Sequence, residues 1–157
     1  MKRVGVGVTG TGYMGQLEAR LCASMGGYEV IGLHNRSVHK AQALAQELSC
    51  RAYGSLDELL ADRRLDALIV ATPNNVHLEP VLKAAAQGVH VFLEKPMGLS
   101  VTQCAEMMAA AKQAGVTLFM GHPQRFMDGL RRARQLLIDG EIGRAVALRV
   151  ERFFWVE

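Results

Sequence analysis

The sequence has few cysteines and little net charge, and both shortages limit the classes of protein it can encode. The three cysteines are odd in number and far apart, without the C-x-x-C spacing of zinc and redox sites: Cys22, Cys50 and Cys104. They suggest neither a disulfide framework nor a metal site, so a reducing cytoplasm is the expected compartment. The formal net charge of +3 is too small to indicate a nucleic acid or a membrane as partner, and it leaves a small anionic ligand open.

Long hydrophobic runs, internal repeats and low-complexity linkers are also absent from the sequence. No apolar stretch approaches the roughly 20 residues of a membrane-spanning helix. Glycines interrupt the apolar residues that follow Met1, so no signal peptide is predicted; they stand at positions 5, 7, 10, 12 and 15. Half of the 157 residues are hydrophobic, which is enough for one compact core and argues against disorder.

Short apolar runs alternate with segments of helical periodicity, which indicates an α/β fold. The expected strands are residues 3–9, 28–34, 67–71, 89–93 and 116–120, with residues 50–53 as a short additional one. Because these runs are almost uniformly apolar, we expect a doubly wound parallel sheet with helices on both faces. Ligands of such sheets bind at the carboxyl ends of the strands.

Helical segments are expected between the strands, and two of them have recognisable starts. Residues 41–48 and 101–111 carry apolar side chains at the spacing of one buried helix face. Ser55 with Glu58, and Ser100 with Gln103, have the spacing of capping boxes. The sequence therefore predicts helices that begin near residues 56 and 101.

The first predicted strand ends in GTGYMG, which matches the G-x-G-x-x-G motif between a strand and a helix. Gly10 permits a tight turn, Gly12 lets a pyrophosphate approach the backbone, and Gly15 allows the helix and the strand to pack closely. We therefore predict a Rossmann dinucleotide-binding domain whose cofactor contacts this loop: Gly10, Thr11, Gly12, Tyr13, Met14 and Gly15. The alternative is a glycine-rich turn without a ligand, and methyltransferases carry similar loops.

The end of the second predicted strand, LHNRS, bears on the choice of cofactor. Asn35 stands where an acidic residue would bind the ribose 2'-hydroxyl of NAD, and Arg36 can pair with a 2'-phosphate. Ser37 can also donate to that phosphate, although the N-cap of the next helix is the preferred interpretation for Ser37 alone. NADP is thus the predicted cofactor and NAD the alternative. A solvated loop arginine remains the competing interpretation of Arg36.

The fourth predicted strand is followed by ATPNNVH. Thr72 and Pro73 end the strand, and Asn74 or Asn75 is expected to cap a helix that runs to about residue 87. Because this loop lies beside the first strand, Thr72, Pro73 and Asn74 are also predicted cofactor contacts. His77 is a further candidate of low weight, since a lone histidine in a first helical turn is more often a packing or surface residue.

Three stretches together, GTGYMG, ATPNNVH and LEKPMGLS, resemble the glucose-fructose oxidoreductase, inositol dehydrogenase and MocA family. The resemblance extends to GHPQRF at residues 121–126 and to IDGEIGRAVALRVER at residues 138–152. It implies an oxidoreductase that passes a hydride between a nicotinamide and a carbon bearing a hydroxyl or carbonyl group. The implied substrate is a sugar, a cyclitol or a similar polyol.

By the same resemblance, Lys95 lies near the nicotinamide and donates a hydrogen bond to the reacting oxygen. An ammonium group at that place stabilises the charge on the reacting oxygen most strongly in a crevice without water. Lys95 is also a candidate to relay the proton. Glu94 helps to orient the site and Pro96 fixes the turn, so both are predicted cofactor contacts. An ordinary polar strand end is the alternative interpretation of Glu94 and Lys95.

The remaining residues, 122–157, are expected to begin a second α/β domain after a cofactor domain over residues 1–121. Phe126, Leu130, Ala133 and Leu137 predict a bridging helix, and residues 145–155 predict the first strand of the new domain. Family members complete this domain, which supplies most of their substrate pocket. A fragment is therefore expected, and a short self-associating protein is the alternative.

Basic residues are frequent in this last part of the sequence. His122 and Arg125 follow the last predicted strand and are weaker candidates, expected to face either the substrate or the solvent; Arg125 is also included among the predicted cofactor contacts. The seven arginines between residues 125 and 152 alternate with acidic residues and mostly lack interleaved aromatics, so a solvated or interdomain face is expected, not a nucleic-acid site.

Two functions follow from these patterns. The first is an NADP-dependent oxidoreductase with a polyol or sugar-like substrate, expected to form a homo-oligomer. The second is a non-catalytic dinucleotide-binding module or a subunit that lends its cofactor to a partner.

Overall fold

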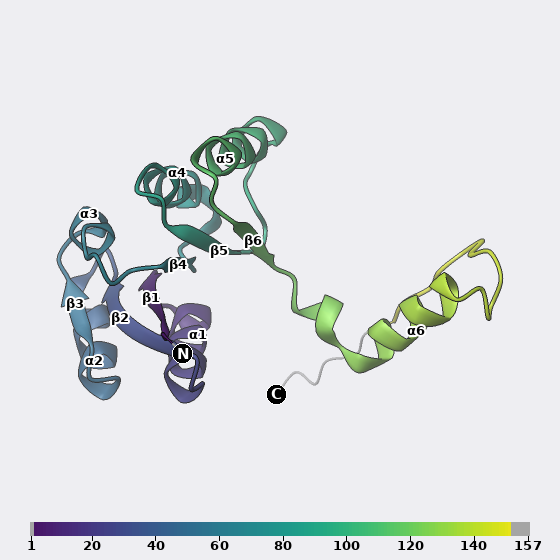
Figure 1. Cartoon of the computed structure of the whole chain (residues 1–157), viewed down its shortest axis with the longest axis horizontal. Coiled ribbons are helices and arrows are strands. Elements are labelled where there is room, and N and C mark those ends of the chain that lie inside the picture. Colours follow the sequence, from purple (N-terminus) through teal and green to yellow (C-terminus); the bar gives the residue numbers. More distant parts are fainter. Residues whose placement is uncertain (1, 152–157) are drawn as a thin grey trace. The chain divides into compact units, whose positions relative to one another are not determined.

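The structure is a computed structural model that describes residues 2–151. Its sheet consists of parallel strands in the spatial order β3-β2-β1-β4-β5-β6 (Figure 1). The strands are β1 (Val4–Thr9), β2 (Tyr28–His34), β3 (Arg51–Tyr53), β4 (Ala67–Val70), β5 (His90–Glu94) and β6 (Leu118–Gly121). The direction of winding reverses between β1 and β4, so the carboxyl ends of these two strands border the crevice in which such sheets bind ligands. The predicted doubly wound Rossmann fold is confirmed.

The helices connect the strands in the expected alternation. They are α1 (Tyr13–Ser24), α2 (Val38–Glu47), α3 (Leu56–Leu60), α4 (Leu78–Ala86), α5 (Val101–Ala114) and α6 (Asp128–Ile138), with the 3-10 helices η1 (Asn74–Val76) and η2 (Pro123–Phe126). Every predicted strand of the sheet occurs. The largest shift of a strand start is at β6, which was predicted from residue 116 and begins at Leu118.

Both predicted capping boxes are present. The hydroxyl of Ser55 accepts a hydrogen bond from the backbone N–H of Glu58 at 3.2 Å, and Ser100 accepts one from Gln103 at the same distance. The Gln103 side chain reaches back to the backbone N–H of Leu99 at 3.0 Å. These contacts satisfy N–H groups that a helix start leaves unpaired, which is why α3 and α5 begin at the predicted positions.

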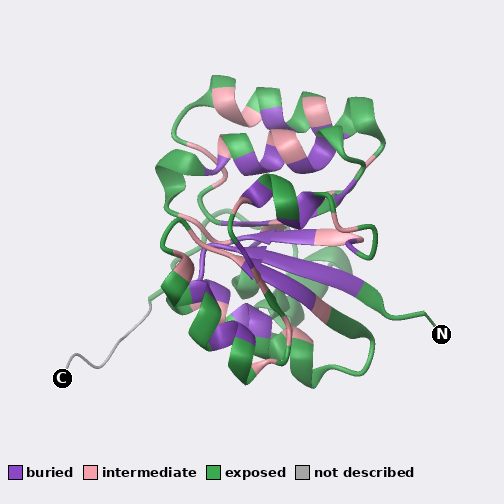
Figure 2. Cartoon of the chain, turned by 90° about the vertical axis from the view of Figure 1, so that its left-hand side faces the viewer, coloured by how far each residue is buried: buried purple, intermediate pink, exposed green. Residues whose placement is uncertain are grey.

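Two hydrophobic clusters lie on opposite faces of the sheet, with α1 and α2 on one side and α3, α4 and α5 on the other (Figure 1). Alternate residues of each strand supply the two clusters. In β4, Leu68 and Val70 pack toward α4 and α5, whereas Ile69 packs toward α1 and α2. The central strands are therefore buried on both sides (Figure 2), as the uniformly apolar runs predict.

The backbone contacts divide the chain into two compact units, the first ending at Gly121 and the second beginning at His122. The second unit contains η2 and α6, so the predicted helix is confirmed for Leu130, Ala133 and Leu137, whereas Phe126 lies in η2 and not in that helix. The strand predicted over residues 145–155 is wrong for residues 145–151, which form no strand. Residues 152–155 of that prediction, and the apolar end FFWV, lie outside the described residues.

A physical reason accounts for the missing strand. Residues 145–150 alternate in hydrophobicity, but a strand also needs a neighbour whose N–H and C=O groups pair with its own. No described residue of the second unit forms such a neighbour. Within residues 2–151, no helix is both long and apolar enough to cross a bilayer.

Candidate functional site

The three motif glycines adopt the backbone geometry that each predicted role requires. Gly10 has φ +91°, and a Cβ atom there would lie 2.5 Å from the carbonyl oxygen of Ala71. A Cβ atom on Gly15 would lie 1.9 Å from the carbonyl oxygen of Gly10, so α1 and the loop pack too closely for any side chain. At Gly12 nothing lies within 4 Å of the added Cβ. The loop is thus tight at both ends and open in the middle, which fits a pyrophosphate against the Gly12 backbone.

Helix α1 points its start at this open position. Gly12 is its N-cap residue, and no side chain caps it. The first N–H groups of a helix lack intrahelical acceptors, so they suit an anion bound at Gly12. Tyr13 is exposed, Met14 is half-buried, and Thr11 is buried directly before the open position.

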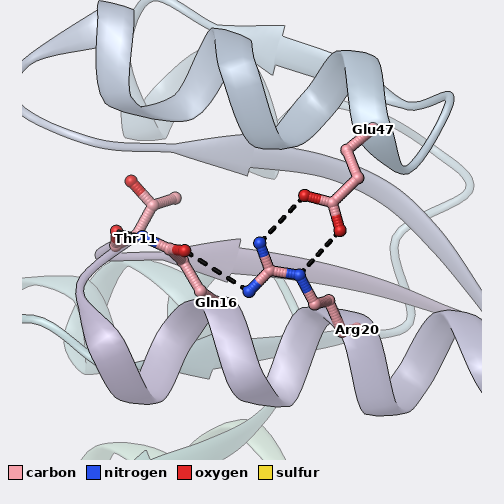
Figure 3. A network of polar contacts seen from close by, with 4 residues as sticks. All are labelled: Thr11, Gln16, Arg20 and Glu47. Atoms are coloured by element: carbon pink, nitrogen blue, oxygen red, sulfur yellow. Dashed lines mark hydrogen bonds and ion pairs between the residues drawn. The ribbon is translucent and has the colours of Figure 1, made fainter.

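A chain of polar contacts supports the loop from the side of α2. Arg20 on α1 donates hydrogen bonds of 2.6 and 2.9 Å to the Glu47 carboxylate on α2, and a longer one of 3.4 Å to the Gln16 side chain. The Gln16 amide donates to the Thr11 carbonyl oxygen at 3.1 Å. Figure 3 shows the four residues together. Because Arg20 and Glu47 are exposed, this network adds little stability, but it holds the Thr11 carbonyl to α1.

The residues after β2 are arranged differently from the prediction in one respect. Ser37 occupies the N-cap position of α2, yet its side chain makes no capping hydrogen bond. Asn35 instead accepts from the Ser37 backbone N–H at 2.9 Å and donates to the Thr11 hydroxyl at 2.8 Å. The Asn35 side chain thus forms the local turn and ties it to the glycine loop. Arg36 is exposed beside it.

The segment after β4 also differs from the prediction. Asn74 and Asn75 lie in η1 and cap nothing, and α4 begins only at Leu78 because the 3-10 turn comes first. Thr72 is half-buried and Pro73 is exposed. The Thr72 hydroxyl oxygen is buried without a hydrogen-bond partner among the described residues, which is unusual for a native polar atom.

His77 joins the ends of two neighbouring strands. Its side chain is 1% exposed; Nδ1 lies 3.0 Å from the carbonyl oxygen of Pro96, and Nε2 lies 2.9 Å from that of Thr72. The interpretation of His77 as a packing residue is correct, and the interpretation as a surface residue is wrong. Its ring fixes the loop after β4 to the loop after β5, and both loops carry predicted cofactor contacts.

Glu94, Lys95 and Pro96 follow one another at the carboxyl end of β5. Glu94 is buried, whereas Lys95 and Pro96 are exposed, and the peptide bond between them is cis. The Glu94 carboxylate accepts a hydrogen bond from the Lys95 backbone N–H at 3.2 Å. The strand end therefore exposes an ammonium-bearing side chain while it keeps a carboxyl group buried.

Sequence reasoning missed one residue of this region, Glu18. It lies on α1, is only 9% exposed, and its carboxyl group interacts with that of Glu94. Burial, together with Glu94, raises the pKa of Glu18 to about 8. The available signal was helical spacing, because Glu18 stands on the inner face of α1 between Gly15 and Cys22.

Arg125 lies in η2 of the second unit, as part of Pro123–Phe126, and His122 directly precedes it. Their predicted role therefore stays a prediction. Among the described residues no group of three potential ligands could hold a metal ion.

Comparison with known proteins identifies the family. The model described as the oxidoreductase family with an NAD-binding Rossmann fold matches residues 4–122, and the chain belongs to this Gfo/Idh/MocA family. The chain is 42% identical over 151 residues to an uncharacterized oxidoreductase of Streptococcus pneumoniae serotype 4, covering 96% of this chain and 41% of that protein. It is 39% identical over 157 residues to 2,7-anhydro-N-acetylneuraminate hydratase of Mediterraneibacter gnavus, covering 100% of this chain and 41% of that protein.

A solved structure agrees with these relatives. The crystal structure of GenD2 from gentamicin A biosynthesis in complex with NAD has a TM-score of 0.85 and 31% identity, over 90% of this chain and 40% of that chain. The chain thus spans about two fifths of the length of the curated relatives it matches.

Proposed function

We propose that this member of the Gfo/Idh/MocA family carries the cofactor site of an NADP-dependent oxidoreductase that acts on a sugar, a cyclitol or a similar hydroxyl-bearing compound. Residues 1–121 bind the cofactor in this proposal, and residues 122–157 begin the part that holds the substrate. The observation that carries the proposal is the glycine loop, which is closed at Gly10 and Gly15 and open at Gly12. The name of the Mediterraneibacter gnavus relative, which refers to a sialic acid derivative, supports a sugar-like substrate.

The preference for NADP rests on the end of β2. The Asn35 side chain is neutral and already engaged with Thr11 and Ser37, so no carboxylate opposes a 2'-phosphate there. The exposed guanidinium of Arg36 and the uncapped hydroxyl of Ser37 are available to bind the phosphate. Thr72, Pro73, Asn74, His77 and Glu94 form the other side of the proposed crevice.

Lys95 is the proposed catalytic residue. A bound nicotinamide supplies the hydride chemistry, and the chain supplies the groups around the reacting carbon. The Lys95 ammonium donates a hydrogen bond to the substrate oxygen, whose charge changes during the transfer. The Glu94 contact to the Lys95 backbone fixes where that side chain starts. Three unpaired cysteines support a cytoplasmic enzyme, and a homo-oligomer remains part of the proposal.

Cofactor choice is tested by titrating NADPH and NADH into wild type, Arg36→Ala and the control Arg63→Ala. The control removes an exposed arginine that is far from Arg36 in the sequence. We expect NADPH to bind the wild type more tightly. Loss of one charge-assisted contact should weaken NADPH binding by about 10- to 100-fold in Arg36→Ala and leave NADH binding unchanged. Equal affinity of the wild type for both cofactors would contradict the proposed preference.

Catalysis is tested on the protein at the length its gene encodes, with a panel of sugars, polyols and their keto forms. Absorbance of the reduced cofactor is followed for wild type and Lys95→Ala. We expect turnover with at least one substrate, and a kcat lower by about 100- to 10,000-fold in the variant. Tight cofactor binding without turnover on any substrate would favour the non-catalytic module.

A further inference from the structure

A buried pair of carboxyl groups lies beneath the proposed nicotinamide side of the site. Glu18 on α1 and Glu94 on β5 are 9% and 7% exposed, and their carboxyl groups are close enough for Glu94 to raise the pKa of Glu18. Two carboxylates that share a site cannot both be ionised without strong repulsion, so such a pair holds a proton between its oxygens. The mechanism proposed above uses Glu94 only to position Lys95, and it gives Glu18 no role.

We propose that Glu18 and Glu94 form a proton-binding pair of the cofactor site, which holds one proton between the two carboxyls and releases it when an oxidised, cationic nicotinamide binds. This coupling of proton release to cofactor binding rests on the proposed function, because it requires a nicotinamide near Lys95. It goes beyond that function because it assigns a role to Glu18 and states how many protons leave when the cofactor binds.

The surroundings of Glu94 fix the position of its carboxyl group. One carboxylate oxygen, Oε2, accepts from the Lys95 backbone N–H at 3.2 Å. The other, Oε1, lies against Gly121 of β6, where an added Cβ would be 2.9 Å away. Only a residue without a side chain at Gly121 leaves this room. Glu94 is thus held in place as a hydrogen-bond acceptor for the Lys95 backbone, and its position next to Gly121 is fixed.

One oxygen of the Glu18 carboxyl group has no partner that would stabilise an ionised state. This oxygen, Oε2, is buried and forms no hydrogen bond among the described residues. An ionised carboxylate with an unpaired buried oxygen is costly, whereas a protonated one that donates to Glu94 is not. In agreement, burial and the neighbouring Glu94 raise the pKa of Glu18 to about 8, which places the proton near the physiological range.

The other titratable groups beside the pair do not compete for this proton. Cys22 lies one turn further along α1, and burial followed by the Glu18 charge raises the pKa of its thiol. Lys95 follows Glu94 and contacts it through the backbone, with its side chain exposed. A positive ring that binds above Glu94 stabilises the doubly ionised pair, whereas a reduced, neutral ring does not. Only the oxidised cofactor should therefore expel the proton.

The test is isothermal titration calorimetry of NADP+ and NADPH at about pH 7.5, in two buffers of different ionisation enthalpy, which counts the protons exchanged on binding. We expect NADP+ to release protons, approaching one per cofactor, and NADPH to release clearly fewer. In Glu18→Gln this difference should vanish while both cofactors still bind. The matched control Glu106→Gln, which removes an exposed carboxylate of α5, should behave as the wild type.

A second readout needs no cofactor. The infrared band of a protonated carboxyl group should be present in the wild type at neutral pH and absent in Glu18→Gln. Equal proton release by NADP+ and NADPH in the wild type, or no such band, would overturn the inference and leave the proposed function intact. Failure of both cofactors to bind the wild type would overturn the proposed function, and the linkage with it.

Discussion

The contact of His77 with two backbone carbonyls predicts a specific cost for its removal. In His77→Leu, an apolar side chain replaces the ring that now lies between the carbonyl oxygens of Thr72 and Pro96, at 2.9 and 3.0 Å. An imidazole has one N–H group when neutral and two when charged, so it donates to at least one of these oxygens. The substitution therefore removes one or two hydrogen bonds and leaves their acceptors inside the protein.

The magnitude follows from the burial of the ring. Each buried hydrogen bond contributes about 1 kcal/mol net, and an acceptor left dry adds about 1–3 kcal/mol. Since His77 is 1% exposed, we expect a loss of about 2–4 kcal/mol in the free energy of unfolding. In a domain of this size that corresponds to a fall in Tm of about 5–15 °C. Because the ring joins two proposed cofactor loops, NADPH affinity should fall as well.

The assay pairs urea unfolding with NADPH titration, and it includes two further variants. Val81→Ala removes packing from α4, the helix that follows His77, at a fully buried position whose apolar side chain cannot donate a hydrogen bond to either loop carbonyl. It should lose stability and keep NADPH affinity. His77→Gln retains one amide donor and should lie between wild type and His77→Leu. Unchanged stability together with unchanged NADPH affinity in His77→Leu would refute the role of the ring.

Two further predictions concern α1. Gly15→Ala should lower the free energy of unfolding in urea by about 3 kcal/mol, because its Cβ would lie 1.9 Å from the Gly10 carbonyl oxygen. Gly12→Ala should leave stability almost unchanged, because nothing lies within 4 Å of its Cβ. The same variant should weaken NADPH binding. An equal stability loss in both glycine variants would contradict this assignment. For Glu18 the folded pKa of about 8 lies above the ordinary 4.5, so its contribution to stability is full below about pH 4.5 and is lost as the pH rises to about 8. Glu18→Gln should therefore gain stability relative to the wild type across that window, by on the order of 5 kcal/mol at most. Parallel pH profiles of the two proteins would argue against a shared proton.

The elements that depend on short stretches of sequence were predictable. The capping boxes at Ser55 and Ser100 involve residues three positions apart, and the contacts occur as the spacing implies. The contact of Gly15 with the Gly10 carbonyl oxygen is equally local, whereas the close approach at Gly10 involves Ala71, which follows β4. The capping boxes and the requirement at Gly15 need no knowledge of how distant segments pack.

Predictions failed where two local solutions compete or where a partner is needed. Ser37 and Asn35 can both satisfy the backbone at the start of α2, and the longer Asn35 side chain also reaches Thr11, so the asparagine forms the turn. The strand predicted over residues 145–155 has a suitable pattern, but its first seven residues have no described strand beside them. Alternation of hydrophobic residues indicates which face would be buried; it does not provide the hydrogen-bonding neighbour.

The two halves of the proposed cofactor site therefore differ in how they are encoded. The pyrophosphate side is built from backbone, and its glycines are visible in the sequence as a motif. The opposite side depends on side chains that meet across elements: Glu18 of α1 reaches Glu94 of β5, and His77, before α4, reaches Pro96. Those pairs are separated by 76 and 19 residues along the chain. Because their roles arise only when the helices dock on the sheet, a glutamate on a helix and a lone histidine had no distinguishing signal beyond an inward-facing position.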